Sequence, residues 1–285
     1  MHSKEQLFAE SGSLLAHPPD LLRAPSFSAV SWLRHSFSGR QGGGTTVYGR
    51  AEDLNLGFTK EDDRAIVSAN RLRLIAATAD DEAGISWAFA HSRQIHSDTI
   101  LTLRAGSLDP AEPADGLLTD VPGVFLAMLT ADCVPVLLVD VRLKAVGVFH
   151  AGWRGTVAGI VRKGVARMQE EYGSNPADIL AAVGPSVGPC CYEVGEEVRT
   201  RFDESFAYAV DLFDGANLNL WEANRQQLLA AGVPAANITV LAQCTACTHH
   251  EGISRFFSHR ADKGVTGRMM ALIGIVPDAL PSEIE

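Results

Sequence analysis

Three apolar runs between residues 124 and 156 constrain the fold more than any other feature of the chain. The runs cover residues 124–129, 134–139 and 145–149, and they are rich in Val, Leu and Phe. Runs of this length without polar alternation are typical of strands that are covered on both faces. We therefore predict an α+β (mixed α/β) fold, in which mixed β-sheets are sandwiched by outer helices within a single domain.

Composition narrows the class of protein. The 285 residues are 46% hydrophobic and carry a net charge of −10, which suits a large core and argues against nucleic acid as a partner. Five cysteines, an odd number, indicate a reducing compartment. There is neither a secretory signal nor an uninterrupted apolar span, so we expect a cytoplasmic protein that contacts no membrane.

The chain divides into a short tail and one long domain. Pro18, Pro19 and Pro25 interrupt the first 26 residues, which we predict to be a loosely ordered tail. Residues 27–285 form the predicted domain. Helices are expected at 59–76, 156–172, 193–207, 219–231 and 266–275, and further strands at 87–95, 179–183 and 238–242. Asn70 and Arg71, near the end of the first helix, are interpreted as solvated.

Polar side chains appear where the apolar runs stop. Asp132 and Cys133 precede the second run, and His150 ends the third, shortly before Arg154. A single cysteine or histidine in such a place is more often a core residue. Together, at strand ends over a buried sheet, these residues favour an active site.

His96, Cys133 and His150 could hold a metal ion. Each follows or ends a predicted strand, so one sheet edge could gather all three. Two imidazoles and one thiolate suit Zn²⁺ first, with Cu²⁺ possible, and three protein ligands leave a fourth position open for water or substrate. Asp132 could orient a ligand or act as a general base. Spacing alone leaves core packing as the alternative.

Two other cysteine motifs are interpreted as packing. Cys244 and Cys247 form a C-x-x-C motif followed by two histidines, which could be a structural zinc site or a redox pair. The adjacent Cys190 and Cys191 could complete such a site only if folding brings them near.

Two stretches could bind an anion. A glycine-rich loop around Arg40 has backbone amides that could form an anion-binding concavity, although an ordinary hairpin is the simpler reading. A helix is expected directly after the Gly-Trp-Arg-Gly turn, and its free amides together with Arg154 would favour an anion.

These motifs together resemble the bacterial laccase-domain family, whose members are described as polyphenol oxidase, peptidoglycan editing factor or purine nucleoside phosphorylase. The resemblance extends from about Phe27 to Ile275. It rests on FSGRQGG at 37–43, LNLG at 54–57, NR at 70–71, QIH at 94–96, LTADCVPVLL at 129–138, HAGWRGT at 150–156, GPSVGPCCYEVGEEV at 184–198, LWEANRQQL at 220–228, CTAC at 244–247 and FFSHRADKGVTGR at 256–268.

The resemblance implies a mixed α/β sandwich and a metal held by His96, Cys133 and His150. It also implies a zinc-dependent purine nucleoside phosphorylase acting on adenosine, inosine and methylthioadenosine, with adenosine deaminase activity. The alternatives are hydrolysis of a serine-containing UDP-MurNAc precursor in peptidoglycan editing, and a copper-binding polyphenol oxidase. The chain has no His-x-His pair, which argues against a multinuclear copper cluster.

From these motifs we assign roles to individual residues. Cys133, Asp132 and Arg154 are the predicted catalytic residues. The predicted substrate-binding residues, one from each of five matched motifs, are Arg40, Asn55, Gln94, Cys244 and Arg260. The expected partner is a small-molecule substrate, and a monomer is the favoured state.

Overall fold

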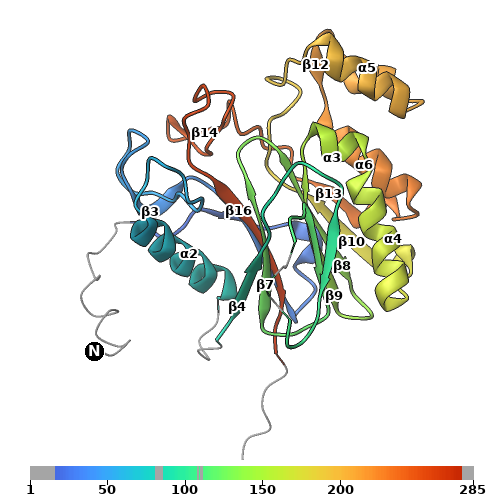
Figure 1. The fold of residues 1–285 in the computed structure, drawn as a ribbon, viewed down its shortest axis with the longest axis horizontal. Helices are drawn as coiled ribbons and strands as arrows, with labels where there is room; N and C mark the ends of the chain where they lie inside the picture. Colours follow the sequence, from blue (N-terminus) through green and yellow to red (C-terminus); the bar gives the residue numbers. More distant parts are fainter. Residues whose placement is uncertain (1–16, 81–85, 108, 110–111, 278–285) are drawn as a thin grey trace, which may run out of the picture.

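Two β-sheets face each other, and helices cover the outer side of each (Figure 1). The computed structural model describes residues 17–80, 86–107, 109 and 112–277. The first sheet has the order β1-β2-β16-β7-β4, with β1 (Leu21–Leu22), β2 (Leu33–Ser38), β16 (Met269–Ile275), β7 (Val124–Thr130) and β4 (Ala88–His91). The second has the order β13-β10-β8-β9-β6-β5, with β13 (Ile238–Val240), β10 (Ile179–Val183), β8 (Val134–Asp140), β9 (Ala145–Ala151), β6 (Gly116–Thr119) and β5 (Ile100–Leu103).

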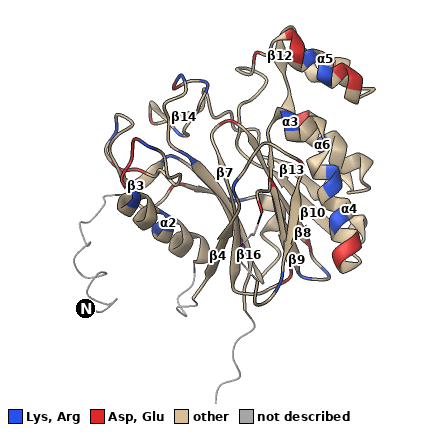
Figure 2. Ribbon diagram, viewed as in Figure 1, with Lys and Arg blue, Asp and Glu red and all other residues tan. Residues whose placement is uncertain are grey.

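Helices lie on both outer faces of this sandwich (Figure 1). The first sheet is covered by α2 (Arg64–Ala79), and the second by α3 (Trp153–Val157), α4 (Ile160–Tyr172) and α6 (Leu220–Ala230). Smaller elements complete the chain: β3 (Gln41–Thr45), α5 (Glu196–Ser205), β11 (Phe213–Asp214), β12 (Asn217–Leu218), β14 (His249–His250), β15 (Ile253–Ser254) and four short 3-10 turns. Lys, Arg, Asp and Glu residues recur along α4 and α5 (Figure 2). None of the helices in the described residues is long and apolar enough to cross a membrane.

Alternate residues of the central strands enter different cores, which explains their unbroken apolar sequences. On β8, Val136 and Leu138 pack with the helices of the second sheet, whereas Leu137 and Val139 face the first sheet. Each such side chain contributes about 1.5–3 kcal/mol when it is fully buried. The predicted mixed α/β sandwich is therefore confirmed, and its strands are buried on both faces as expected.

The helix predicted at residues 266–275 is wrong, because this segment forms the central strand β16 of the first sheet. β16 pairs antiparallel with both β2 and β7, so that Ile273 lies opposite His35 and Leu126. Every residue of β16 is buried. A short apolar run carries no period that separates a buried strand from a buried helix, and only the gap between β2 and β7 decides the outcome.

The expected loose tail is too long at its C-terminal end. Leu21 and Leu22 pair with β2, and Asp20 forms an ion pair with Arg255 at 2.8 Å. Ala24 is buried, and its amide donates to Nε2 of His35. Ordered packing thus begins before Phe27, while residues 1–16 lie outside the described part of the chain.

Several helix boundaries differ from those expected. The first helix begins after Asp63, whose carboxylate accepts from the Ala65 amide, and not after Thr59. The helix expected at 156–172 is divided by Gly159, which has a φ of +79° and separates α3 from α4. The helix expected at 219–231 is confirmed as α6, and Asn219 caps it, since its side chain accepts from the Glu222 amide.

Candidate metal centre and cavity

The side chains of His96, Cys133 and His150 converge. One ligand atom from each lies within 4.8 Å of the other two, and Nε2 of His96 is 4.0 Å from Sγ of Cys133. Ligands on a tetrahedral ion with bonds of about 2.0–2.3 Å are about 3.3–3.8 Å apart. The predicted triad therefore has donor atoms that suit a single metal ion, and the separation of 4.0 Å between His96 and Cys133 is slightly longer than that between ligands bound to one.

The triad lies where the two sheets meet, not on one sheet edge as we expected. His150 is on β9 of the second sheet. Cys133 is in the connection that carries the chain from β7 in the first sheet to β8 in the second. His96 follows β4 and has a φ of +61°, a conformation that a residue with a side chain rarely adopts. His150 is buried, whereas His96 is exposed and Cys133 is half-buried.

Asp115 orients the triad, a role that the sequence analysis gave to Asp132. Its carboxylate accepts from Nδ1 of His150 at 2.8 Å, from the amide of His96 at 3.0 Å and from the amide of Ser97 at 2.7 Å. The bond to Nδ1 leaves Nε2 of His150 available as a ligand, as in other carboxylate–histidine–metal arrangements. Burial would raise the pKa of Asp115, but these donors hold it well below its usual range. In the sequence, only the position of Asp115 directly before the strand β6 could have indicated this role.

Cys133 and His150 polarise each other. Burial alone would raise the pKa of Cys133, but the charge of His150 and hydrogen bonds from both histidines lower it to about 6. Burial would lower the pKa of His150, but the Cys133 thiolate and Asp115 raise it to about 9. Without a metal the two side chains therefore form a thiolate–imidazolium pair at neutral pH, and a metal ion that binds both would displace the His150 proton from Nε2.

Gly152 lets the ligands approach one another. A Cβ atom at this position would lie 3.0 Å from Sγ of Cys133 and 3.4 Å from Cδ2 of His96. The backbone of Gly152 is extended, with a φ of −64° and a ψ of 173°, so any residue could adopt it. Space beside the ligands, and not backbone freedom, is what this glycine provides.

Asp132 joins three loops beside the triad. Its carboxylate accepts from the Thr245 hydroxyl at 2.6 Å, the Ser258 hydroxyl at 2.7 Å and the Arg260 amide at 2.7 Å. Its φ of +86° is unusual for a residue with a side chain, and these bonds offset the strain. The contacts favour a positioning role, because they occupy the carboxylate that a general base would need.

A cavity of about 790 Å³ opens beside the triad. Its lining joins the three candidate ligands to cationic, aromatic and polar side chains from both sheets. Besides the triad, it is lined by Phe58, Arg71, His91, Ser92, Arg93, Gln94, Leu129, Ala131, Asp132, Tyr192, His259, Arg260 and Arg268. Cavities of about 300–1,000 Å³ with a few convergent polar groups are typical small-molecule sites.

Two of the predicted substrate-binding residues line this cavity. Gln94 binds the backbone of Leu129 through both its amide nitrogen and its amide oxygen, at 2.8 Å each, so the loop before His96 is fastened to β7. Arg260 lies over the ring of Tyr192, with its guanidinium 5.4 Å from the ring centroid.

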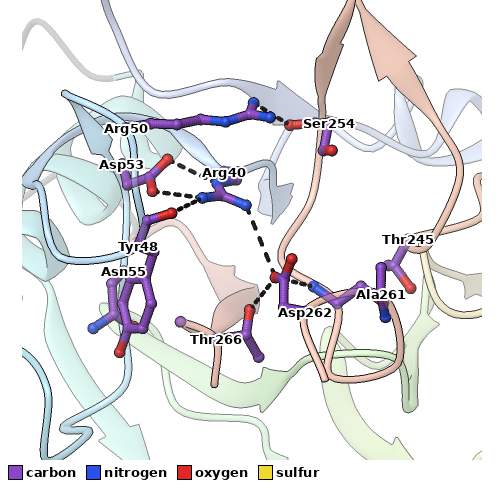
Figure 3. Close-up of polar contacts among 12 residues, drawn as sticks. Arg40, Tyr48, Arg50, Asp53, Asn55, Thr245, Ser254, Ala261, Asp262 and Thr266 are labelled. Atoms are coloured by element: carbon purple, nitrogen blue, oxygen red, sulfur yellow. Dashed lines mark hydrogen bonds and ion pairs between the residues drawn. The ribbon is translucent and has the colours of Figure 1, made fainter. Parts of the chain in front are cut away.

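Arg40 and Asn55 lie outside the cavity lining. Arg40 is buried, and both carboxylate oxygens of Asp53 accept from it at 2.8 Å (Figure 3). Asn55 is also buried and connects Asp62 to the backbone of Arg268. The geometry gives both residues structural roles, because their polar atoms are already bonded within the protein.

Cys244 and Arg154 are also absent from the lining. Cys244 belongs to a separate cluster of cysteines. Arg154 is exposed and stacks on Trp153, with its guanidinium 4.2 Å from the ring. Burial raises the pKa of Tyr192, which lines the cavity, and the positive charge of Arg154 slightly lowers it.

Arg71 is one of the cavity residues that the sequence analysis missed, since it was interpreted as solvated. It is only 8% exposed, Nε donates to the Leu56 carbonyl, and Phe58 stacks on its guanidinium at 4.2 Å. Burial, with a smaller contribution from Arg64, lowers its pKa to about 10. Its place in the Asn-Arg motif could have indicated a functional role, but the helical periodicity predicted that it lies on the outer face of the helix.

Comparisons with known proteins agree with this geometry. The family model described as multi-copper polyphenol oxidoreductase laccase matches residues 34–276. The purine nucleoside phosphorylase YlmD of Geobacillus stearothermophilus is 40% identical over 274 residues, which cover 90% of this chain and 97% of that protein. The adenosine deaminase RL5 of an unknown prokaryotic organism is 40% identical over 182 residues, covering 59% of this chain and 68% of that protein.

Solved structures show the same fold. The crystal structure of the Bacillus licheniformis hypothetical protein YfiH has a TM-score of 0.79 and 35% identity, and the match covers 92% of this chain and 98% of that one. The family model, the relatives and the fold all support the resemblance that the motifs indicated. The chain belongs to the multi-copper polyphenol oxidoreductase laccase family.

Proposed function

We propose that this chain is a zinc-dependent purine nucleoside phosphorylase that also deaminates adenosine. The observation that carries the proposal is one cavity that brings an open His₂Cys triad together with arginine side chains, among which Arg71 forms no ion pair within the described residues. The names of the relatives, purine nucleoside phosphorylase and adenosine deaminase, point to the same two reactions. We place the enzyme in the reducing cytoplasm, where Cys133 would not be oxidised, and a monomer remains the predicted state.

Phosphate would bind on the cationic side of the cavity. Arg71 makes no ion pair among the described residues, and its contacts are a carbonyl, His91 and aromatic rings. A buried guanidinium without a carboxylate partner favours an anionic ligand. Arg268 lines the same cavity, and a planar guanidinium can donate two parallel hydrogen bonds to a phosphate.

The aromatic side chains of the lining suit a purine nucleoside. Phe58 and Tyr192 both line the cavity, and the volume of about 790 Å³ accommodates a nucleoside together with phosphate. Burial raises the pKa of Tyr192 to about 12, so its hydroxyl stays protonated at neutral pH and can donate a hydrogen bond to the ligand.

The residues divide the work around the triad. His96, Cys133 and His150 would hold Zn²⁺, which supplies Lewis-acid chemistry and lowers the pKa of a water molecule. Asp115 keeps the His150 proton on Nδ1, and Arg71 would align phosphate for attack on the ribose carbon that carries the base. In phosphorolysis the glycosidic bond breaks and ribose-1-phosphate forms. In deamination water replaces the amino group, which leaves as ammonia.

Copper chemistry is less well supported. A blue-copper His₂Cys site usually has a weak axial methionine, and none of the described residues lining the cavity is methionine. The other cluster able to hold a metal in the described residues contains four cysteines and no histidine. Hydrolysis of a serine-containing UDP-MurNAc precursor remains a prediction that the same triad could serve.

The test is a product assay on purified protein of known metal content. Adenosine with phosphate should yield adenine and ribose-1-phosphate, and adenosine without phosphate should yield inosine. Inosine and methylthioadenosine should be phosphorolysed as well. If no purine nucleoside is converted by the zinc-loaded protein, the proposed function is wrong.

A matched pair of variants tests the phosphate site. Arg71→Gln removes the unpaired charge, so the KM for phosphate should rise at least about tenfold, while phosphate-independent deamination should change less. Arg64 stacks on the same Phe58 ring at 4.2 Å but lies outside the lining, so Arg64→Gln should leave the KM for phosphate unchanged. Equal effects of Arg71→Gln on both reactions would contradict the assignment.

A further inference from the structure

Four of the five cysteines gather at a second place, away from the cavity lining. Ligand atoms of Cys190, Cys191, Cys244 and Cys247 all lie within 4.8 Å of one another. Sγ of Cys190 is 3.6 Å from Sγ of Cys247. The sequence analysis interpreted these residues as packing, because nothing in the spacing showed that the two pairs, more than fifty residues apart, would meet.

We propose that these four cysteines bind a single structural Zn²⁺ ion. Sulfurs around a tetrahedral Zn²⁺ with bonds of about 2.3 Å are about 3.8 Å apart, close to the 3.6 Å between Cys190 and Cys247. A closed set of four thiolates is typical of structural zinc sites, and it leaves no open position for a substrate. A cluster of several irons would hold its cysteines around a larger core.

Backbone contacts hold the two loops in position for this ion. The amide of Thr245 donates to the Ser186 carbonyl at 2.9 Å, and the amide of Ser186 donates to the Gln243 carbonyl at 3.1 Å. These bonds continue the pairing of β10 with β13 into both cysteine loops. The loops are therefore in register without help from the cysteine side chains.

Cys244 is already surrounded as a thiolate ligand would be. The amides of Gly188 and Ala246 both donate to its Sγ, the first at 3.2 Å. A hydrogen bond from a backbone amide to the first sulfur of a C-x-x-C motif stabilises the negative charge on that sulfur. A Cβ atom on Gly188 would lie 3.2 Å from Cβ of Cys244 and 2.6 Å from Trp221, so glycine permits this close approach.

The ion would fasten one wall of the cavity. Tyr192, which lines the cavity, directly follows Cys191, and Thr245, which donates to Asp132, directly follows Cys244. Asp132 in turn accepts from the amide of Arg260. The zinc would thus join the two loops that position Tyr192 and Asp132 without touching the substrate.

Metal analysis of the full chain, purified under reducing conditions without added metal, tests the proposal. We expect two zinc ions per chain, and one in each of two variants: Cys133→Ser, which retains the four-cysteine site, and Cys190→Ser, which retains the triad. Cobalt loaded into Cys133→Ser should show the intense visible absorption of tetrahedral thiolate coordination. If Cys133→Ser contains neither zinc nor cobalt, the proposal is wrong, whatever the enzymatic activity.

Thiol counting on the wild-type protein gives an answer even if Cys190→Ser fails to fold. With zinc bound, the four cysteines should be slow to react with a thiol reagent and become reactive when a chelator is added. Chelation and denaturation should then expose all five thiols. A disulfide within the cluster, detected by mass spectrometry of protein purified in reductant, would overturn the proposal.

Discussion

The triad and the four-cysteine cluster are two groups of potential metal ligands that differ in their donor atoms and their surroundings. The triad mixes two imidazoles with one thiolate, and it lines a cavity of about 790 Å³. The cluster has four sulfurs, on loops that follow β10 and β13, and lies outside that lining. An incomplete ligand set beside a cavity suits catalysis, and a complete set between two loops suits stability.

Removing one sulfur from each site should give the largest contrast. Cys133→Ser should lower kcat/KM for adenosine phosphorolysis by more than about 100-fold, because the triad loses its thiolate. Cys190→Ser should lower it by less than about tenfold, but should lower the melting temperature more than Cys133→Ser does. Phosphorolysis assays and thermal unfolding of both variants check this, and similar losses of activity would remove the distinction.

Asp115→Asn should weaken the triad without touching the cluster. The neutral Asn side chain no longer offers a charged acceptor to Nδ1 of His150, so zinc affinity or activity should fall about 10–100-fold. Zinc titration in a competitive chelator measures the affinity. Excess zinc should restore part of the activity, and a variant that binds zinc as tightly as the wild type would show that Asp115 does not orient the ligand.

Gly152→Ala should have a smaller effect of the same kind. The added methyl group lies 3.0 Å from Sγ of Cys133 and should lower zinc affinity by about tenfold while leaving the fold intact. Gly195 is the matched control, because it also precedes a helix with extended backbone, φ −81° and ψ 173°, and has no atom within 4 Å of the added position. Equal zinc affinity in both alanine variants would contradict the steric argument.

Acid can destabilise the protein either by releasing a metal ion or by protonating a buried group. His35, which belongs to neither the triad nor the cluster, isolates the second effect. Burial and then the charge of Arg23 lower its pKa to about 4, and its Nε2 accepts from the Ala24 amide. A histidine with a depressed pKa contributes stability that is complete above its unfolded pKa of about 6.5 and is lost as the pH falls towards 4. Between pH 7 and 5 this loss is about 2 kcal/mol.

Urea unfolding of the wild type and His35→Gln at pH 7 and pH 5, both with saturating zinc, checks this contribution. The variant should be less stable at pH 7 and should lose about 2 kcal/mol less on acidification. Parallel pH dependence in the two proteins would mean that His35 does not titrate as its burial requires.

The sequence by itself determined the apolar strands, the mixed α/β class and the ligand triad. An apolar run such as residues 134–139 is long enough to predict its own burial. His96, Cys133 and His150 lie in motifs that are specific to one protein family. Periodicity failed for β16 (Met269–Ile275), because a strand buried on both faces has the same apolar pattern as a buried helix.

Only the tertiary structure decided which polar residues meet. Asp115 reaches His150 across paired strands, Arg71 turns into the cavity while Arg40 is bound to Asp53, and two cysteine pairs come together through the register of β10 and β13. Such contacts join residues that are far apart along the chain. Their distances depend on strand order and sheet packing, which no local pattern of residues specifies.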